Sequence, residues 1–334
     1  MNILIFRTDR IGDFFLTSIL IKSIKRNFPN SNISVICSYK NYDFIKRYSL
    51  VENAYLFEKR NFWSLFKLKN ILNKKKIDYV FIIDGKQRSI IFSLFIKAKE
   101  KFYTLTKQNS KILKIVKNKS IIYDNEIDFN KIDIIKKNLK LLNCDLIEDD
   151  FDIFKNEKFM SKFDLDRSKI NINKYLMLHL DEKWVYEKYI QEYLNIQPNI
   201  QDLVKFLNKL IDQKKINLVI TSGIEKNILF EKLKSTFSKL EDNIYKKDYN
   251  NFAIFLFDSV NIYDLIFLIS KASLLITCHG APSHIASSLN VKSIDIIDPS
   301  EHILFNKWTS HLRQHNQISR KEFSRLSEEI VNLC

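Results

Sequence analysis

Glycine is scarce in this chain of 334 residues, which contains only four. No segment reads G-x-G-x-x-G, the loop that holds a dinucleotide pyrophosphate. None reads G-x-x-x-x-G-K-[ST], the loop that cradles nucleotide phosphates. The sequence therefore disfavours ordinary dinucleotide and P-loop chemistry.

Long apolar runs, a secretory leader and closely spaced cysteines are missing as well. No stretch reaches about 18 uninterrupted apolar residues, so no membrane-spanning helix is expected. The N-terminal residues MNILIF lack the basic start and long apolar core of a signal peptide. The cysteines show no metal-ligand spacing and lie at Cys37, Cys144, Cys278 and Cys334. Reduced thiols and a cytoplasmic location are the simplest interpretation.

Acidic residues are too few to balance the basic ones. The formal net charge is +15, and residues 1–165 carry most of it, with 32 Lys and Arg against 19 Asp and Glu. Such a one-sided field suits an anionic partner, either nucleic acid, a phospholipid surface or a phosphorylated acceptor. A compositionally biased genome would also produce this richness in Lys, Asn and Ile. No recognised nucleic-acid motif occurs, and nucleic acid is not expected as a partner.

Short apolar runs alternate with amphipathic stretches almost throughout, which predicts an α/β fold with parallel sheets covered on both faces. Strands are predicted over 2–6, 32–37, 53–57, 79–83, 101–105, 175–180, 216–221, 252–257, 273–277 and 292–297. Helices are predicted over 14–28, 61–75, 88–97, 199–212, 225–238, 261–270, 281–290 and 320–333. The alternation breaks at about 145–172, a polar and acidic stretch that we interpret as a link between two doubly wound domains. Ligands of such sheets bind at the carboxyl ends of the strands.

The first strand-end loop holds Arg7, Arg10, Gly12 and Asp13. Gly12 would permit a tight turn from strand to helix. Asp13 has two interpretations: a helix cap, or a general base beside arginines that hold an anionic substrate.

A second loop, TCHGAPSHIASSLNV at 277–291, follows a predicted strand and opens a helix. Helix N–H groups and the histidines His279 and His284 suit a diphosphate. The alternatives are a capped helix with a buried histidine, or a metal site that would add Cys278.

Three further strand-end loops hold polar residues. Lys183 could reach a phosphate or lie on the surface. Glu225 could bind ribose hydroxyls or merely cap a helix. The segment IIDGKQRSII at 82–91 brings Asp84, Gly85, Arg88 and Ser89 to a strand end.

Taken together, these loops resemble glycosyltransferase family 9, the ADP-heptose:lipopolysaccharide heptosyltransferases. The likeness covers the whole chain in the family's order. Its motifs are Arg7 with Gly12 and Asp13 before FFLTSILIKSIKRNFP, Arg88 with Ser89, Lys183 with Trp184, Gly223 with Glu225, and CHGAPSHIA from Cys278. The chain departs from the family on the donor side: the last motif has Cys278 in place of an aspartate and His279 in place of Thr or Ser. The family's glycine-rich segment after the first strand of the second domain reads LHLDEKW here. These changes leave the sugar nucleotide open.

The resemblance implies a GT-B fold, with two Rossmann-like domains facing across a cleft. Residues 1–165 would bind the acceptor and residues 166–334 the nucleotide sugar. The last helix belongs to the second range but could pack back on the first domain. The implied reaction is an inverting, metal-independent glycosyl transfer without a cofactor, in which Asp13 is the base. The implied donor-binding residues are Lys183, Ser222, Gly223, Glu225, Cys278, His279, Gly280 and His284. The implied acceptor-binding residues are Arg7, Thr8, Arg10, Arg88 and Ser89.

The implied substrates are a nucleotide sugar, ADP-heptose first among them, and an anionic glycolipid such as a lipopolysaccharide core. The protein would then work at the cytoplasmic face of the inner membrane. The segment RNFWSLFKLKNILNKKK at 60–76 mixes aromatics with lysines. It could touch that surface, but packing of Phe62, Leu65, Phe66 and Ile71 on the sheet is the favoured interpretation.

Two other functions stay open. One is a GT-B transferase with another sugar for capsule, O-antigen or glycoprotein synthesis. The other is a non-catalytic binding protein of the same fold, because the donor motif is altered.

Overall fold

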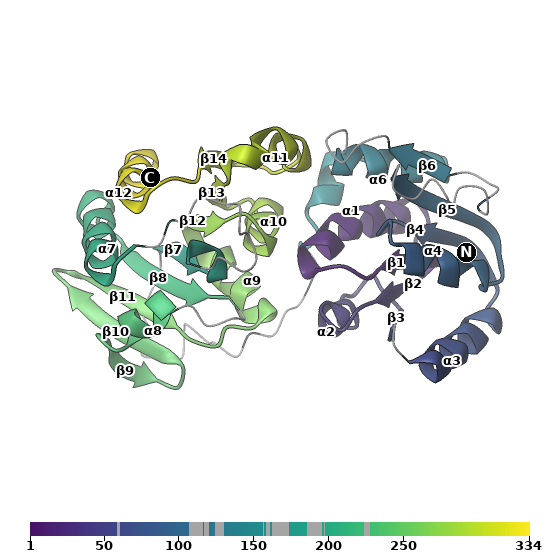
Figure 1. Cartoon of the computed structure of the whole chain (residues 1–334), viewed down its shortest axis with the longest axis horizontal. Coiled ribbons are helices and arrows are strands. Elements are labelled where there is room, and N and C mark those ends of the chain that lie inside the picture. Colours follow the sequence, from purple (N-terminus) through teal and green to yellow (C-terminus); the bar gives the residue numbers. More distant parts are fainter. Residues whose placement is uncertain are drawn as a thin grey trace. The chain divides into compact units, whose positions relative to one another are not determined.

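The computed structural model describes residues 1–58, 61–106, 116, 120–123, 130–155, 157, 161, 174–185, 196, 198–223 and 228–334. The chain forms two compact units. The first consists of Met1–Glu157 with Asn306–His311, and the second of Lys158–Phe305 with Leu312–Cys334. Each unit has a sheet with helices packed against it (Figure 1).

The sheet of the first unit has the strand order β3-β2-β1-β4-β5-β6, and its neighbouring strands are parallel. Its strands are β1 (Asn2–Arg7), β2 (Asn32–Cys37), β3 (Asn53–Leu56), β4 (Ile77–Ile82), β5 (Ala98–Thr106) and β6 (Ser120–Tyr123). Its helices are α1 (Ile11–Asn27), α2 (Tyr42–Ile45), α3 (Phe62–Asn73), α4 (Gln87–Leu94) and α6 (Lys131–Lys140), with the 3-10 turn η3 (Glu148–Phe151). The chain runs from β1 outward to β3 and then returns to the other side of β1 with β4. That reversal is the switch point of a doubly wound sheet, where ligands bind.

The sheet of the second unit has the order β14-β13-β12-β7-β8-β11-β10-β9. It is parallel from β14 to β11, and β10 and β9 are antiparallel. Its strands are β7 (Tyr175–Leu180), β8 (Asn217–Ser222), β9 (Ser238–Glu241), β10 (Ile244–Tyr249), β11 (Phe252–Phe257), β12 (Ala272–Cys278), β13 (Lys292–Ile297) and β14 (His315–Ser319). Its helices are α7 (Ile200–Lys214), α8 (Ile228–Lys234), α9 (Ile262–Lys271), α10 (Ala281–Ser288), α11 (His302–Trp308) and α12 (Phe323–Leu333), with the 3-10 turns η4 (Glu182–Trp184) and η5 (Pro299–Glu301). The switch point of this sheet lies between β7 and β12.

The two units divide earlier than the sequence suggests, at Glu157 rather than at residue 165. The acidic stretch after residue 145 is folded onto the first unit because it pairs with basic residues of α1. Arg26 makes a 3.0 Å ion pair with the buried carboxylate of Asp150. Tyr48 donates a 3.1 Å hydrogen bond to the carbonyl of Ile153.

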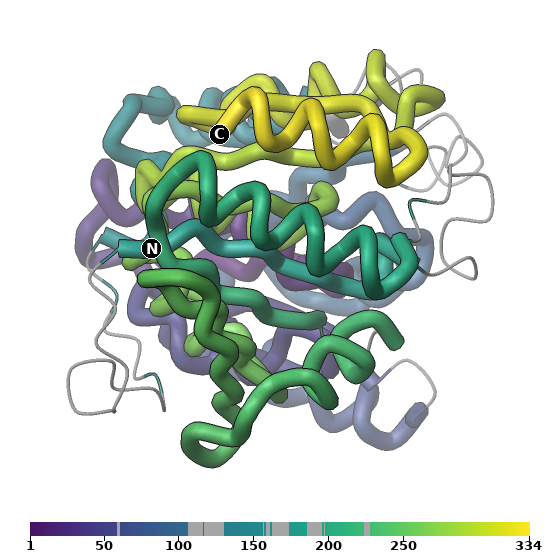
Figure 2. The backbone as a smooth tube through the Cα atoms, turned by 90° about the vertical axis from the view of Figure 1, so that its left-hand side faces the viewer, coloured from purple at the N-terminus to yellow at the C-terminus, as the bar shows by residue number. Residues whose placement is uncertain are grey.

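The last helix, α12, belongs to the second unit and not to the first. Its buried face, including Leu326 and Ile330, joins the core of that unit. Phe323 packs edge-on against Phe206 of α7, with 5.6 Å between the ring centroids. Figure 2 shows α12 running beside α7. The segment that returns to the first unit is instead Asn306–His311, around the end of α11.

Of the α3 residues favoured above to pack on the sheet, Leu65 packs against the core of the first unit, but Phe62, Phe66 and Ile71 do not. Phe62 and Trp63 are 74% and 71% exposed, and Phe66 and Ile71 are also exposed. Leu68 and Leu72, on the opposite side of the helix, supply its buried face. Within the described residues, no helix has both the length and the apolar character that crossing a bilayer requires.

The scarcity of glycine shows in the turns. Among the described residues, Gly85 is the only glycine in the left-handed region, with a φ of 60°. Asparagine occupies four other left-handed positions: Asn143, Asn243, Asn250 and Asn290. Asparagine tolerates this conformation better than most residues with a side chain.

Candidate functional site

Asp84, the second residue after β4, holds together the loops at the switch point of the first sheet. One of its carboxylate oxygens accepts hydrogen bonds from the hydroxyls of Thr8 and Ser89, each at 2.6 Å, and from the Thr8 amide at 3.3 Å. The other oxygen accepts from the Lys86 amide at 3.2 Å. Arg88 in turn donates to the Thr8 hydroxyl at 3.3 Å. Thr8, Arg88 and Ser89 therefore meet around Asp84, which the sequence placed at this strand end but not among the acceptor-binding residues.

Arg7 is buried at the end of β1. Its Nε donates to Thr17 at 2.7 Å and its Nη1 to Asp9 at 3.0 Å. Burial lowers the pKa of Arg7, and the nearby carboxylates of Asp13 and Asp84 partly oppose that shift. Lys86 also makes an ion pair with Asp9. Arg7 is thus largely committed to holding the loop.

Asp13 is the third residue of α1, and its carboxylate accepts no hydrogen bond from any described residue. It is not the helix cap, because the cap position is held by the exposed Arg10. Gly12 also differs from expectation: it lies inside the first helical turn and not in a left-handed turn. The strand-to-helix connection is made before it, by Thr8, Asp9 and Arg10.

A pocket of about 380 Å³ opens beside Asp13 within the first unit. Its lining residues come from α1, α6, the ends of β1, β4 and β5, and the end of α11: Arg7, Asp9, Asp13, Leu16, Thr17, Leu20, Ile83, Asp84, Gly85, Gln87, Thr104, Lys131, Ile134, Ile135, Asn138 and Trp308. Of the expected acceptor residues, Arg7 lines this pocket. Thr8, Arg10, Arg88 and Ser89 are not among the lining residues.

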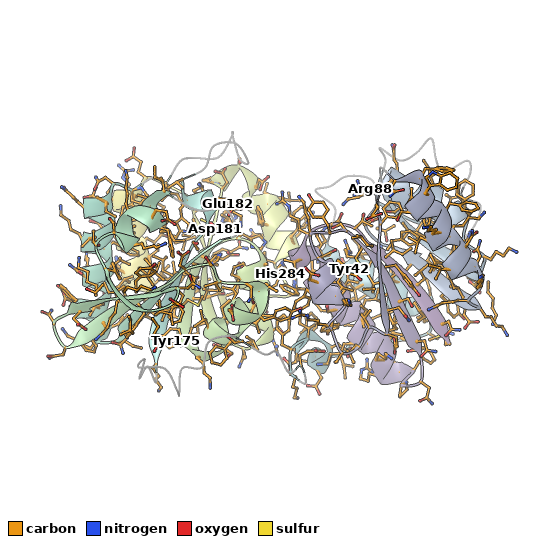
Figure 3. All side chains as sticks on the ribbon, turned by 90° about the horizontal axis from the view of Figure 1, so that it is seen from below. Tyr42, Arg88, Tyr175, Asp181, Glu182 and His284 are labelled. Carbon is orange, nitrogen blue, oxygen red and sulfur yellow. The ribbon has the colours of Figure 1, made fainter. Side chains whose placement is uncertain are left out.

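Lys183 lies at the switch point of the second sheet, in the 3-10 turn that follows β7. Its ammonium donates a 2.6 Å hydrogen bond to the carbonyl of His279 and makes a 3.0 Å ion pair with Asp181. Burial by itself would lower the pKa of Lys183, but the charges of Asp181, Cys278 and Glu182 and its hydrogen bond to Asp181 together raise that pKa. The loops after β7 and β12 are therefore joined through one fully charged lysine. Figure 3 shows Asp181 and Glu182 beyond one end of β7 and Tyr175 at its other end.

Gly280 lies next to this lysine as the cap residue of α10, with extended backbone. A Cβ there would come within 2.7 Å of the Lys183 ammonium. The glycine is thus required by the close approach of Lys183 and not by a tight turn.

The ring of His279 is held in place by the buried carboxylate of Asp295. Its Nδ1 lies 2.5 Å from Asp295, which also contacts Nε2 of His315 at 2.9 Å and the Ser283 hydroxyl at 2.8 Å. Burial alone would raise the pKa of Asp295, but the two histidines bring it well below its usual range. The ring of His284 lies 5.7 Å from that of His279, centroid to centroid.

Cys278 is fully buried, and Arg320 donates to its sulfur at 3.7 Å. Burial raises the pKa of this thiol, so it stays protonated. Within the described residues, no group of three or more His, Cys, Asp or Glu side chains is placed to hold a metal.

Two further donor residues end β8. Ser222 is buried, and its hydroxyl contacts the carbonyl of Gly223 at 3.3 Å. A Cβ on Gly223 would lie 2.8 Å from the carboxylate of Glu182, so a side chain at this position would displace that carboxylate. Glu225 lies outside the described residues.

The sequence did not single out Asp181, Asp295 or Arg320 as site residues. Asp181 directly follows a strand, which is a usable signal. Asp295 lies inside a strand and Arg320 follows a strand of polar residues, so neither shows a signal without the fold.

No family model matches this sequence, and no curated protein matches it. Solved structures match over the whole chain. The E. coli heptosyltransferase WaaC with ADP is 12% identical to this chain and superposes with a TM-score of 0.66. The match covers 100% of this chain and 96% of that one. The E. coli ADP-heptose lps heptosyltransferase II is 14% identical, with a TM-score of 0.65 and coverages of 100% and 98%. The glycosyl transferase family 9 structure from Veillonella parvula is 12% identical, with a TM-score of 0.69 and coverages of 99% and 90%.

A more distant match is a putative UDP-N-acetylglucosamine 2-epimerase from Listeria monocytogenes. It is 11% identical, with a TM-score of 0.53 and coverages of 99% and 87%. At such identities the likeness concerns the fold. It confirms the expected GT-B architecture and the resemblance to family 9 at that level.

Proposed function

We propose that this chain is an inverting glycosyltransferase that moves a sugar from a nucleotide donor to an acceptor hydroxyl. The observation that carries the proposal is the Asp13 carboxylate, which lines a pocket at the carboxyl end of β1 and accepts no hydrogen bond from the described residues. A carboxylate in that state is available to take a proton.

In the proposed reaction, Asp13 removes the proton of the acceptor hydroxyl while its oxygen attacks the anomeric carbon. The bond between that carbon and the diphosphate oxygen breaks, and the electron pair leaves with the nucleoside diphosphate. Attack from the face opposite the leaving group inverts the configuration. Positive charge near the diphosphate stabilises the leaving group.

On the donor side, Lys183 supplies that charge, and the imidazole of His279 and the first N–H groups of α10 donate hydrogen bonds to the diphosphate. These protein groups are the reason to expect transfer without a metal. Ser222 and Gly223 line the same end of the sheet, and Glu225 is expected to hold the ribose. The structural neighbours solved with ADP and with ADP-2-deoxy-2-fluoro heptose make ADP-heptose the first donor to test.

On the acceptor side, we propose an anionic glycolipid such as a lipopolysaccharide core. The excess of basic residues in the first half supports it. So does α3, which exposes Phe62, Trp63 and Phe66 beside Lys67 and Lys69. Aromatic rings with lysines are suited to the interface of an anionic membrane, and this surface would hold the protein at the cytoplasmic membrane face.

The matching test compares the wild-type chain with Asp13→Asn, incubated with ADP-heptose and a set of truncated lipopolysaccharide cores that includes cores ending in a neutral sugar. We expect ADP release to fall by about 10²-fold or more, the usual contribution of a general base, with ADP affinity unchanged. Asp43→Asn is the matched control, because Asp43 is a first-turn acid of α2 that does not line the pocket. Full turnover by Asp13→Asn would remove Asp13 as the base.

Two other functions would show in the same assays. ADP binding with no turnover of any sugar nucleotide would favour a non-catalytic protein, in line with Cys278 and His279 in the donor motif. The epimerase neighbour suggests sugar-nucleotide epimerisation as the second alternative. NMR would detect it as conversion of UDP-N-acetylglucosamine in the absence of an acceptor.

A further inference from the structure

The pocket beside Asp13 contains polar atoms that the chain itself leaves without partners. Thr104 on β5 and Asn138 on α6 both line it, and they are 2% and 1% exposed. The Thr104 hydroxyl and the Asn138 Oδ1 have no hydrogen-bond partner among the described residues. A buried polar atom in that state costs about 1–3 kcal/mol, so the pair points to a ligand that satisfies both.

The orientation of Asn138 is fixed by its own helix. Its amide nitrogen donates a 2.8 Å hydrogen bond to the carbonyl of Ile134. The oxygen is therefore the atom left for the pocket, and an amide oxygen only accepts hydrogen bonds. The Asp13 carboxylate accepts as well, so the pocket calls for a ligand rich in donors.

The charges around the pocket also exclude an anion from its interior. Three lining residues are acidic, Asp9, Asp13 and Asp84, against the two cations Arg7 and Lys131. The guanidinium of Arg7 already donates to Asp9 and Thr17 (side-chain contacts of 3.0 and 2.7 Å). A carboxylate or phosphate inside would be repelled by Asp13 and would leave the Asn138 oxygen unpaired.

The remaining wall is apolar. It is formed by Leu16, Leu20, Ile83, Ile134 and Ile135, with the ring of Trp308 at one side. Sugar rings have apolar C–H faces and hydroxyl edges. The faces match the apolar side of the pocket, and the hydroxyls match its polar side. At about 380 Å³ the pocket is at the small end of ligand sites, a size for a single sugar unit.

We propose that this pocket binds a neutral monosaccharide unit, the terminal sugar of the acceptor, and that Thr104 and Asn138 select it through its hydroxyls. The inference rests on the proposed function, which makes Asp13 the base. The anionic groups of the glycolipid would then lie outside the pocket, and the sugar that receives the new bond would carry no charge.

The test uses the full chain saturated with ADP and measures binding of matched methyl glycosides by saturation-transfer NMR. The pairs are the methyl glucoside, galactoside and mannoside, each beside its uronic acid, which replaces only the C6 hydroxymethyl with a carboxylate. We expect at least one neutral glycoside to bind at least about tenfold more tightly than its acidic counterpart. Thr104→Val, which removes one hydroxyl without changing shape, should weaken that binding about five- to tenfold, and Asn138→Leu should do so too.

The same variants separate a binding role from a structural one. Loss of an unpaired buried hydroxyl should leave the melting temperature of Thr104→Val unchanged or higher. Ser31→Ala is the control, because Ser31 also has a buried, unpartnered hydroxyl in this unit but does not line the pocket. It should not alter sugar binding.

Equal or tighter binding of the uronic acids would overturn the inference, as would no saturable binding of any neutral glycoside. Failure to bind ADP in the first place would instead count against the proposed function.

Discussion

Gly280 shows how one missing side chain shapes the donor loop. An alanine would place its Cβ 2.7 Å from the Lys183 ammonium, which is the end of a flexible side chain. The ammonium would move aside at little cost in stability but lose its hydrogen bond to the His279 carbonyl. We expect Gly280→Ala to weaken ADP binding about tenfold or more, measured by titration calorimetry, with the melting temperature nearly unchanged.

The effect should act through the lysine alone. Lys183→Met removes the ammonium that Gly280→Ala would displace. In a double-mutant cycle, adding Gly280→Ala to Lys183→Met should therefore cause no further loss of ADP affinity. Additive losses would show that Gly280 contacts the donor in some other way.

His179 makes the protein sensitive to acid. It is buried on β7, 2.8 Å from the Thr221 hydroxyl, and burial lowers its pKa to about 3. The unfolded chain binds a proton at this histidine below its ordinary pKa of about 6.5, whereas the folded chain does not. Stability is therefore present above pH 6.5 and lost as the pH falls toward 3.

This loss amounts to about 2 kcal/mol at pH 5, at roughly 1.4 kcal/mol for each pH unit. His179→Gln should flatten the acid side of the stability curve by that slope in urea unfolding at pH 4–7. His302→Gln, at an exposed position, should leave the slope unchanged. Equal slopes for wild type and His179→Gln would show that His179 is protonated in the fold.

At the scale of elements, α3 carries the proposed membrane contact. Its rings Phe62, Trp63 and Phe66 are exposed. Changing all three to serine should reduce binding to phosphatidylglycerol vesicles by about a hundredfold or more, because each buried ring contributes roughly 1.5–3 kcal/mol. Vesicle sedimentation measures this, and added salt should weaken the remaining binding.

Trp63→Ser has a control in Ile303→Ser, since both wild-type side chains are 71% exposed but Ile303 lies on α11. If both single variants bind vesicles equally well, α3 is not the contact.

The sequence predicted elements with a clear apolar pattern and missed those without one. Strands such as β1 and β13 are continuous buried runs and were found. The edge strands β14, with the polar sequence HNQIS, and β9 lack that run, as does β10 beside β9, and these three strands were not found. Helix α6 was missed as well, and with it the wall of the pocket that holds Asn138.

The site divides in the same way. Asp13, Lys183 and His279 follow strands or open helices, where spacing alone marks them. Asp295 and Thr104 act through strand adjacency: Asp295 pairs in register with Thr277 of β12, eighteen positions earlier in the chain. Such partners appear only when the sheet order is known.

At the scale of the whole molecule, each unit has its own hydrophobic core. The proposed donor residues all belong to the second unit. ADP at about 100 times its Kd should therefore stabilise the second unit by about 2.7 kcal/mol. Scanning calorimetry should show two transitions, of which ADP raises one.

Core variants identify the transitions. Leu72→Ala should lower that of the first unit and Leu326→Ala that of the second, since both leucines are fully buried and such losses cost about 2–5 kcal/mol. A single transition moved by both variants and by ADP would contradict this independence.

The asparagines at left-handed turn positions have a practical consequence. Asn143, Asn243, Asn250 and Asn290 each occupy a conformation that glycine enters without steric cost. In a chain with four glycines, these left-handed turns are thus occupied by asparagines. The four positions offer a protein engineer sites for raising heat resistance that are distinct from Asp13, Lys183 and His279.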